Sequence, residues 1–174
     1  IAAIAPSGRE LARRIARAVG PSARSVVEIG AGTGVVTRAL LDGGIPADGL
    51  LVVEHNRELA ALLERRFPGV EVVRGDAFDL EAVIEAAGSV RAGRVDAVVS
   101  GLGLATVDRD RQRALLEQAF RVLRRSGRFV QYTYAVGGEN ARTFKDGKSL
   151  IFMRFCNART IPQELDERWF PVVY

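Results

Sequence analysis

Short apolar runs alternate with amphipathic stretches along most of the chain. The apolar runs are rich in β-branched residues and lack polar alternation, which is typical of strands covered on both faces. Each run is followed by a turn and then by apolar residues about 3.6 positions apart, the spacing of a helix with one buried face. The predicted strands are 25–30, 50–56, 70–76, 94–104 and 128–134. The predicted helices that follow the first four strands are 35–44, 57–67, 79–88 and 108–127.

This order predicts a doubly wound α/β fold with a mostly parallel sheet and helices on both faces. The tail, residues 135–174, is less regular: 135–149 has the composition of a loop, and 150–158 and 167–174 resemble two strands. We expect the tail to complete a seven-stranded sheet with an antiparallel C-terminal strand. A chain of 174 residues is too short for two ordinary domains, so 1–174 is predicted to be one domain.

An amphipathic helix region, residues 1–20, precedes the first strand. Ser7 and Glu10 have the spacing of a capping box, and Leu11, Ile15 and Val19 fall on one face. Arginines surround that face at positions 9, 13, 14 and 17. One interpretation is a helix that packs over the sheet or over a ligand site. The other is an interfacial helix that lies on anionic lipid.

A glycine-rich turn, "EIGAGTG" at residues 28–34, follows the first strand. In open α/β sheets ligands bind beyond the carboxyl ends of the strands, so this turn is a candidate site. A dinucleotide fingerprint, G-x-G-x-x-G, would place its last glycine where Val35 stands. A phosphate loop of the G-x-x-x-x-G-K-[ST] type is excluded, because no lysine follows. The spacing therefore weakens a dinucleotide function and argues against a nucleotide triphosphate.

The overall charge is modestly positive, with 25 basic and 21 acidic residues and a sequence pI near 9.8. This balance favours anionic partners, whether nucleic acid or an acidic lipid surface. Cys156 is the only cysteine, so no internal disulfide is possible and a reducing compartment is expected. An apolar run of about eighteen residues, as a membrane-spanning helix needs, is absent from the sequence. The chain begins at Ile1 and ends in an apolar run at Tyr174, so we expect both ends to be trimmed.

The E-x-G-x-G-x-G pattern resembles the first motif of class I S-adenosylmethionine-dependent methyltransferases. The resemblance implies a Rossmann-like methyltransferase fold, with S-adenosylmethionine as cofactor and S-adenosylhomocysteine as product. In that family the glycine turn approaches the methionine part of the cofactor, and the acidic residue, here Glu28, helps to hold its ammonium group. The turn residues assigned to the cofactor site on this basis are Gly30, Ala31, Gly32, Thr33 and Gly34.

Two later strand ends carry the acids that this family uses. Glu54 lies about twenty residues further on, where an acid can accept both ribose hydroxyls. Asp76, followed by Ala77, stands where the family accepts a hydrogen bond from the adenine amine. The alternative is that both acids are ordinary loop residues. His55 is the only histidine; we expect it to line the adenine, and the alternatives are a solvated loop residue or a catalytic base.

The residues at the end of the fourth predicted strand indicate which kind of substrate accepts the methyl group. Enzymes that methylate the amines of nucleic-acid bases commonly carry Asn/Asp-Pro-Pro-Tyr/Phe there. This chain instead has Ser100, Gly101 and Leu102, followed by Gly103. An adenine dimethylase similar to the ribosomal RNA enzymes, which share the glycine motif, would thus lack its working motif. The resemblance adds four further expected cofactor contacts: Ser7, Ser100, Gly101 and Leu102.

A wider resemblance covers residues 2–16, 26–41, 95–104 and 115–134. These segments are similar to the soluble-type bacterial phospholipid N-methyltransferases, which convert phosphatidylethanolamine stepwise to phosphatidylcholine. Gly103 departs from the proline expected there. The resemblance implies a cytoplasmic enzyme bound peripherally to an anionic membrane, with a phospholipid substrate and no nucleic acid, metal or obligate protein partner. The rivals are an RNA methyltransferase, a cofactor-binding domain without catalysis and a nicotinamide dehydrogenase.

Several residues are candidates for the acceptor side. Tyr132 and Tyr134, at the end of the fifth strand, are expected to orient the amine, relay its proton or hold the methylated cation; the alternative is that one of them belongs to the core. Guanidinium groups bind phosphate bidentately. The candidates for the lipid phosphate are Arg154, Arg142 and Arg159, and those for the membrane surface are Arg9, Arg13 and Arg17.

Overall fold

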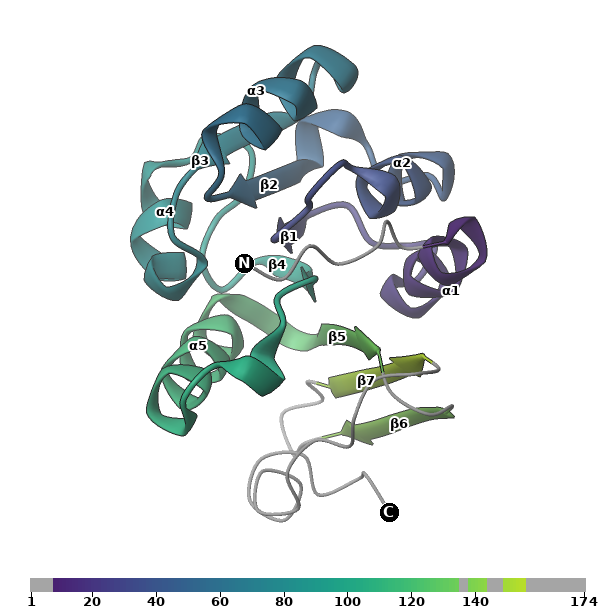
Figure 1. The fold of residues 1–174 in the computed structure, drawn as a ribbon, viewed down its shortest axis with the longest axis vertical. Coiled ribbons are helices and arrows are strands. Elements are labelled where there is room, and N and C mark those ends of the chain that lie inside the picture. Colours follow the sequence, from purple (N-terminus) through teal and green to yellow (C-terminus); the bar gives the residue numbers. More distant parts are fainter. Residues whose placement is uncertain (1–7, 135–137, 144–148, 156–174) are drawn as a thin grey trace.

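The structure is a computed structural model that describes residues 8–134, 138–143 and 149–155. Its strands form one sheet in the order β3-β2-β1-β4-β5-β7-β6 (Figure 1). They are β1 (Val26–Ile29), β2 (Leu50–Glu54), β3 (Glu71–Arg74), β4 (Val95–Ser100), β5 (Leu123–Tyr134), β6 (Gly138–Thr143) and β7 (Ser149–Phe155). The helices are α1 (Arg9–Val19), α2 (Val35–Asp42), α3 (Arg57–Arg66), α4 (Leu80–Ala86) and α5 (Arg109–Val122), with short 3₁₀ turns at Ala47–Gly49, Ala77–Asp79 and Leu104–Thr106.

The five strands from β1 to β5 are parallel, which confirms the predicted α/β architecture. β1 lies in the centre, where Val26 pairs with Leu50 of β2 on one side and with Ala97 of β4 on the other. Strands β2 and β3 follow β1 on one side of it, and β4 and β5 lie on its other side. The gap between the ends of β1 and β4 is therefore a topological switch point, the place where open sheets of this kind bind ligands.

The far edge of the sheet differs from the prediction. Residues 138–143, predicted to be part of a loop, form β6, which pairs antiparallel with β7. β7 itself runs parallel to β5, so β6 is the antiparallel strand of the described part of the sheet. The segment 167–174 lies outside the described residues. β6 escaped detection because an edge strand can be polar and glycine-rich without losing its pairing.

The end of α5 also differs from the prediction, which continued the helix to residue 127. The helix ends at Val122, and β5 begins at Leu123. The pairing of β4 with β5 shifts register after Val95, and Ser126 adopts a φ of 63°. This irregularity lets the chain leave the helix directly into the sheet, as a β-bulge does.

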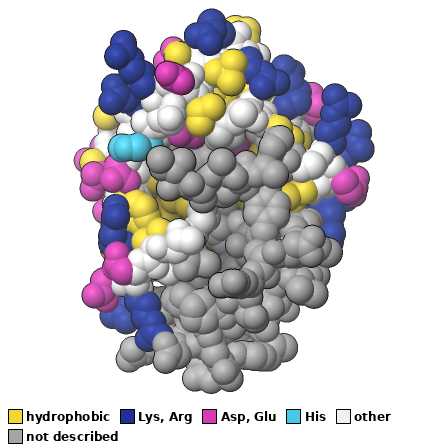
Figure 2. Space-filling view, viewed as in Figure 1, with side chains coloured by type: hydrophobic (Ala, Val, Ile, Leu, Met, Phe, Trp, Pro, Cys, Tyr) yellow, Lys and Arg dark blue, Asp and Glu magenta, His cyan; other side chains and the backbone are white. Residues whose placement is uncertain are grey.

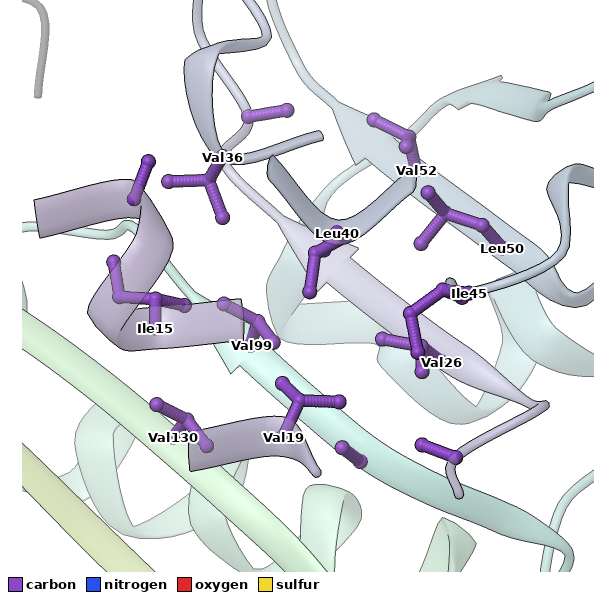
Figure 3. Close-up of a cluster of buried hydrophobic side chains, with 14 of the residues drawn as sticks. Ile15, Val19, Val26, Val36, Leu40, Ile45, Leu50, Val52, Val99 and Val130 are labelled. Carbon is purple, nitrogen blue, oxygen red and sulfur yellow. The ribbon is translucent and has the colours of Figure 1, made fainter. Parts of the chain in front are cut away.

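Helices cover both faces of the sheet. On one face, α4 and α5 bury Leu80, Ile84 and Leu115 against the strands. On the other, α1, α2 and α3 pack over β1, β2 and β4, as the cluster around Ile15 and Leu40 shows (Figure 3). Burying one such aliphatic side chain contributes about 2 kcal/mol to stability. The sheet is thus a rigid support for the loops at its carboxyl edge.

Helix α1 belongs to this core. Leu11, Ile15 and Val19 are buried, which confirms that its apolar face packs on the protein. The apolar face is therefore not free to enter lipid, and contact of the exposed arginines with an anionic membrane remains a prediction. The N-cap is Gly8, without a side-chain cap, and Ser7 lies outside the described residues. A membrane-spanning helix is missing from the described part of the chain.

Candidate functional site

The carboxyl ends of β1, β2 and β4 are tied together by backbone hydrogen bonds. The N–H of Gly30 donates to the carbonyl of Val53 at 2.9 Å, and the N–H of Gly101 donates to the carbonyl of Ile29 at 2.9 Å. The turns that leave β1 and β4 therefore start from one rigid platform. This platform lies at the switch point of the sheet, where the sequence places its candidate ligand residues.

The turn after β1 depends on its glycines. Gly30, Gly32 and Gly34 all have positive φ, at 72°, 58° and 82°. A Cβ on Gly34 would clash with the Phe67 ring and lie 2.7 Å from Leu63 Cδ2, so this glycine lets α3 approach the turn. A Cβ on Gly32 would meet none of the described residues within 4 Å. Gly32 therefore presents bare backbone to an open space, as a turn that receives a ligand at close range requires.

Glu54 holds this turn against the end of β2. Its Oε2 accepts from the N–H of Gly32 at 3.0 Å, and its Oε1 accepts from the N–H of Asn56 at 2.9 Å. The side chain is 7% exposed. Because a carboxylate has about four acceptor positions, each oxygen retains capacity for a ligand hydroxyl. The structure thus gives Glu54 a role that the sequence did not predict, which is to fix the glycine turn.

Glu28 lies beneath the turn and is 1% exposed. Its Oε2 accepts from the hydroxyl of Thr37 at 2.7 Å, whereas its Oε1 has no hydrogen-bond partner among the described residues. Burial raises the pKa of Glu28 to about 7; the hydrogen bond from Thr37 opposes the rise, and the nearby charge of Glu54 adds to it. An unpaired carboxylate oxygen in this position is a ready acceptor for a buried cationic donor.

The raised pKa of Glu28 predicts how stability changes with pH. The ordinary pKa is 4.5 and the folded value is about 7, so between these limits the folded protein binds more protons than the unfolded chain. Stability should fall as pH rises through this window. Glu28→Gln, which cannot ionise, should leave stability nearly unchanged near pH 4.5. Near pH 8 it should raise the free energy of unfolding by about 3 kcal/mol, since each pKa unit corresponds to about 1.4 kcal/mol.

Urea unfolding of the ligand-free protein across this pH range would measure the effect. Glu64→Gln, the same change on the exposed surface of α3, is the matched control and should show no comparable trend. A Glu28→Gln variant whose stability difference from the parent is constant with pH would contradict the prediction.

At the end of β3, the 3₁₀ turn Ala77–Asp79 lies against helix α5. Asp76 caps the turn at Ala77–Asp79, and its Oδ1 accepts from the N–H of Phe78 at 3.0 Å. Its Oδ2 lies 3.8 Å from Nη2 of Arg111, which also stacks over the Phe78 ring at 4.2 Å. The Asp76 side chain is 44% exposed, so it can reach a ligand. Ala77 is buried beside it.

The ends of β4 and β5 form the opposite wall. Leu102 packs over Gly30, where an added Cβ would lie 2.8 Å from Leu102 Cδ2. Tyr132 is buried and its hydroxyl lies directly against Gly101. Ser100 Oγ and Gln131 Oε1 are buried and have no hydrogen-bond partner among the described residues. This wall therefore combines an apolar surface with polar atoms that remain available.

The remaining predicted site residues either make no contact described above or lie outside the described residues. Thr33 and His55 are exposed, and His55 is visible at the surface in Figure 2. Ala31 is buried behind the turn. The following lie outside the part of the chain whose side chains the structure describes: Ser7, Tyr134, Arg142, Arg154 and Arg159. The roles assigned to all of these residues remain predictions.

Some residues of the site were not predicted from the sequence. Thr37 and Gln131 are polar residues in otherwise apolar positions, a signal that could have identified them. Arg66 carried no such signal. Its Nη1 donates to the carbonyl of Thr33 at 2.7 Å, which ties α3 to the glycine turn. Arg111 likewise reaches Asp76 across a separation in sequence that no local pattern reveals.

Comparisons with known proteins bear on this site. A family model described as a methyltransferase domain matches residues 26–127. The ornithine lipid N-methyltransferase of Singulisphaera acidiphila is 38% identical over 137 residues, which cover 76% of this chain and 70% of that protein. The ribosomal RNA small subunit methyltransferase A of Methylococcus capsulatus is 44% identical over 77 residues. That match covers 41% of this chain and only 29% of that protein.

The fold has counterparts among solved structures. The glycopeptide N-methyltransferase MtfA, solved with S-adenosylmethionine, aligns with a TM-score of 0.63. The alignment covers 95% of this chain and 82% of that one, at 18% sequence identity. At this identity the likeness establishes the fold alone.

Proposed function

The chain belongs to the class I S-adenosylmethionine-dependent methyltransferases, and from this membership we propose that it transfers methyl groups to the amine of a membrane lipid. S-Adenosylmethionine is the methyl donor. The observation that carries the lipid proposal is the length of the match to the ornithine lipid enzyme. Its 137 residues exceed the 26–127 range of the family domain, so the similarity extends beyond the part that methyltransferases of many substrates share.

The residues at the strand ends fit the cofactor. The unpaired Oε1 of Glu28 suits the ammonium group, and the open space over Gly32 suits the methionine chain. Glu54 retains acceptor capacity for ribose hydroxyls, and the exposed carboxylate of Asp76 suits the adenine amine. On this proposal Ala77 and His55 border the adenine. The assignments rest on donor and acceptor chemistry at the switch point.

The acceptor side needs few chemical groups. The bound cofactor supplies a methyl group on a sulfonium, which moves to the amine nitrogen as the sulfur–carbon bond breaks and leaves S-adenosylhomocysteine, while the amine loses a proton. The chain must therefore orient a neutral amine. Tyr132, a buried residue whose hydroxyl lies beside Gly101, is the candidate to contact it. Leu102 supplies an apolar wall, and Arg154 is a candidate for the lipid phosphate.

The finer proposal concerns the lipid itself. Phosphatidylethanolamine, methylated stepwise to phosphatidylcholine at the cytoplasmic membrane surface, is the first candidate. The similarity to an ornithine lipid enzyme makes an ornithine-based lipid the second. Labelled S-adenosylmethionine should be offered with liposomes of either lipid. Label should enter a lipid amine, and its absence from both lipids would contradict the proposal.

An RNA substrate is the alternative, favoured by the ribosomal RNA relative and the basic composition. It is disfavoured at the end of β4, where Ser100 to Gly103 lack the residues that grip a planar base amine. An RNA enzyme would place label in nucleic acid, with binding that weakens steeply as salt increases. The same labelling experiment therefore separates the two substrate classes.

The hydrogen bond from Arg66 to Thr33 predicts a cofactor-binding defect. Arg66→Ala should weaken binding of S-adenosylhomocysteine about threefold to tenfold, because one exposed charged hydrogen bond contributes about 1 kcal/mol. Isothermal titration calorimetry would measure it. Arg65→Ala removes the same charge from the next position of α3, where no partner is found within the described residues, and should bind normally. Equal affinities for the two variants would show that Arg66 does not support the turn.

A further inference from the structure

A buried carboxamide lies where β5 pairs with the end of β4. Gln131 of β5 is 1% exposed and stands in register with Ser100, the last residue of β4. Its Nε2 donates to the carbonyl of Leu102 at 3.0 Å and to the carbonyl of Tyr132 at 2.8 Å. Gln131 therefore ties β5 to the loop that connects β4 with α5, which forms one wall of the site (Figure 1).

These contacts determine which end of the carboxamide stays free. Carbonyl oxygens only accept hydrogen bonds, so the nitrogen of Gln131 must face them and its Oε1 is left over. This Oε1 is buried and has no hydrogen-bond partner among the described residues, and the same holds for Oγ of Ser100. Buried acceptors without a donor destabilise a fold. Two of them on paired residues of the ligand-binding edge indicate that a ligand supplies the donors.

The carboxamide approaches the loop after β4 from the face of the sheet opposite to Tyr132. Phe129 packs with residues of α5, whereas Tyr132 packs with residues of α1. Side chains alternate along a strand, so Gln131 lies on the α5 face. Gly101 and Leu102, which begin the loop, are only partly buried. A small group can therefore approach this strand end, where β5 offers polar side chains on both faces.

The free oxygens suit an amine that accepts a methyl group. The attacking nitrogen uses its lone pair, and its N–H groups can donate to nearby oxygens at the same time and so orient it. A neutral primary amine has two N–H groups, a monomethylated amine has one and a dimethylated amine has none. Burial also favours the neutral amine over its ammonium form, and only the neutral amine can attack.

We infer that Gln131 recognises the acceptor amine: its Oε1 accepts one N–H, and Ser100 Oγ accepts the second N–H of a primary amine. The loop from Gly101 to Val107 contains no carboxamide of its own. On this inference, β5 supplies the acceptor that enzymes for base amines carry directly after β4. The inference rests on the proposed lipid function and extends it, because Gln131 then assists transfer to primary and monomethylated amines but not to dimethylated ones.

Transfer rates on three methylation states of one lipid test this inference. The full chain and its Gln131→Met variant would receive S-adenosylmethionine and detergent-dispersed lipid. The lipid is phosphatidylethanolamine or an ornithine lipid, whichever the parent methylates, together with its monomethyl and dimethyl forms. Methionine has nearly the shape of glutamine but no N–H or carbonyl group. Gln131→Met should lower transfer to the first two amines about tenfold more than transfer to the dimethylated amine, as expected for one lost hydrogen bond.

Gln112→Met is the matched control for the loop. Gln112 of α5 is also buried, and its Nε2 donates to the carbonyls of Leu104 and Val107 at 2.7 and 2.6 Å. Its loss should loosen the same loop and lower all three rates by a similar factor. If Gln131→Met also lowered the three rates alike, Gln131 would only hold the loop, and the inference would be overturned while the lipid function stands.

Ser100→Ala keeps the test decisive if Gln131→Met does not fold, which thermal unfolding would reveal. The substitution breaks no hydrogen bond of the described residues, so the variant is expected to fold. Transfer to the primary amine should fall about threefold or more relative to the other two amines. Relative rates equal to those of the parent would overturn the inference. A parent protein that methylates none of these amines would instead overturn the lipid function, and the inference with it.

Discussion

Gly32→Ala is expected to abolish most cofactor binding while the protein still folds. An added Cβ at this position meets no atom of the described residues within 4 Å, so this part of the fold has room for it. That same space is where the cofactor is proposed to approach the backbone. A methyl group forced into such a closely packed contact costs about 1 to 3 kcal/mol. Binding of S-adenosylhomocysteine should therefore weaken between about tenfold and about 100-fold.

The matched control for this substitution is Gly93→Ala. Gly93 has a similar φ of 74°, and an added Cβ there would likewise meet none of the described residues within 4 Å, but Gly93 lies in the turn before β4. Both variants should lose about 1 to 2 kcal/mol of stability, since alanine is strained in the left-handed region. Only Gly32→Ala should lose cofactor affinity. If both variants bound the cofactor normally in calorimetry, the open space over Gly32 would not be the cofactor site.

The strand ends were predictable because the physics that places them is local. A buried strand reveals itself as an unbroken apolar run, and the residue that follows it must lie at the carboxyl edge of a parallel sheet. Glu54 and Asp76 were placed correctly at that edge for this reason. The centre of the sheet and the helices that cover it follow from the same patterns. β6 could not be found in this way, because an edge strand does not require apolar alternation.

The contacts within the site were less predictable, because they depend on tertiary packing. Glu28 was expected to face a ligand, yet one of its oxygens is held by Thr37 and its pKa is raised by burial. Arg66 and Arg111 come from helices whose exposed faces look like ordinary solvated surface. Each reaches a residue more than thirty positions away in the chain. Sequence periodicity reports which face of a helix is buried, but not which turn its polar face will meet.

Gly101→Ala is expected to disrupt the wall of the site and the fold together. A Cβ on Gly101 would lie 2.6 Å from the carbonyl oxygen of Gly30 and would clash with the hydroxyl of Tyr132. The carbonyl belongs to the turn after β1, which the hydrogen bond from the N–H of Gly101 to Ile29 holds in place. Overpacking of this kind costs about 1 to 3 kcal/mol. Methyl transfer should fall strongly, because β4 and Tyr132 must shift apart.

Gly103→Ala is the control for this substitution. Its nearest contact would be Thr106 Oγ1 at 3.7 Å, an ordinary separation, so stability and transfer should be nearly unchanged. The double variant Gly101→Ala with Tyr132→Phe removes the hydroxyl but keeps the clash with Gly30. Its stability should therefore recover only in part relative to Gly101→Ala, measured by urea unfolding as a double-mutant cycle. Additive effects of the two changes would show that Tyr132 does not press against Gly101, and the proposed contact of its hydroxyl with the acceptor would lose its structural basis.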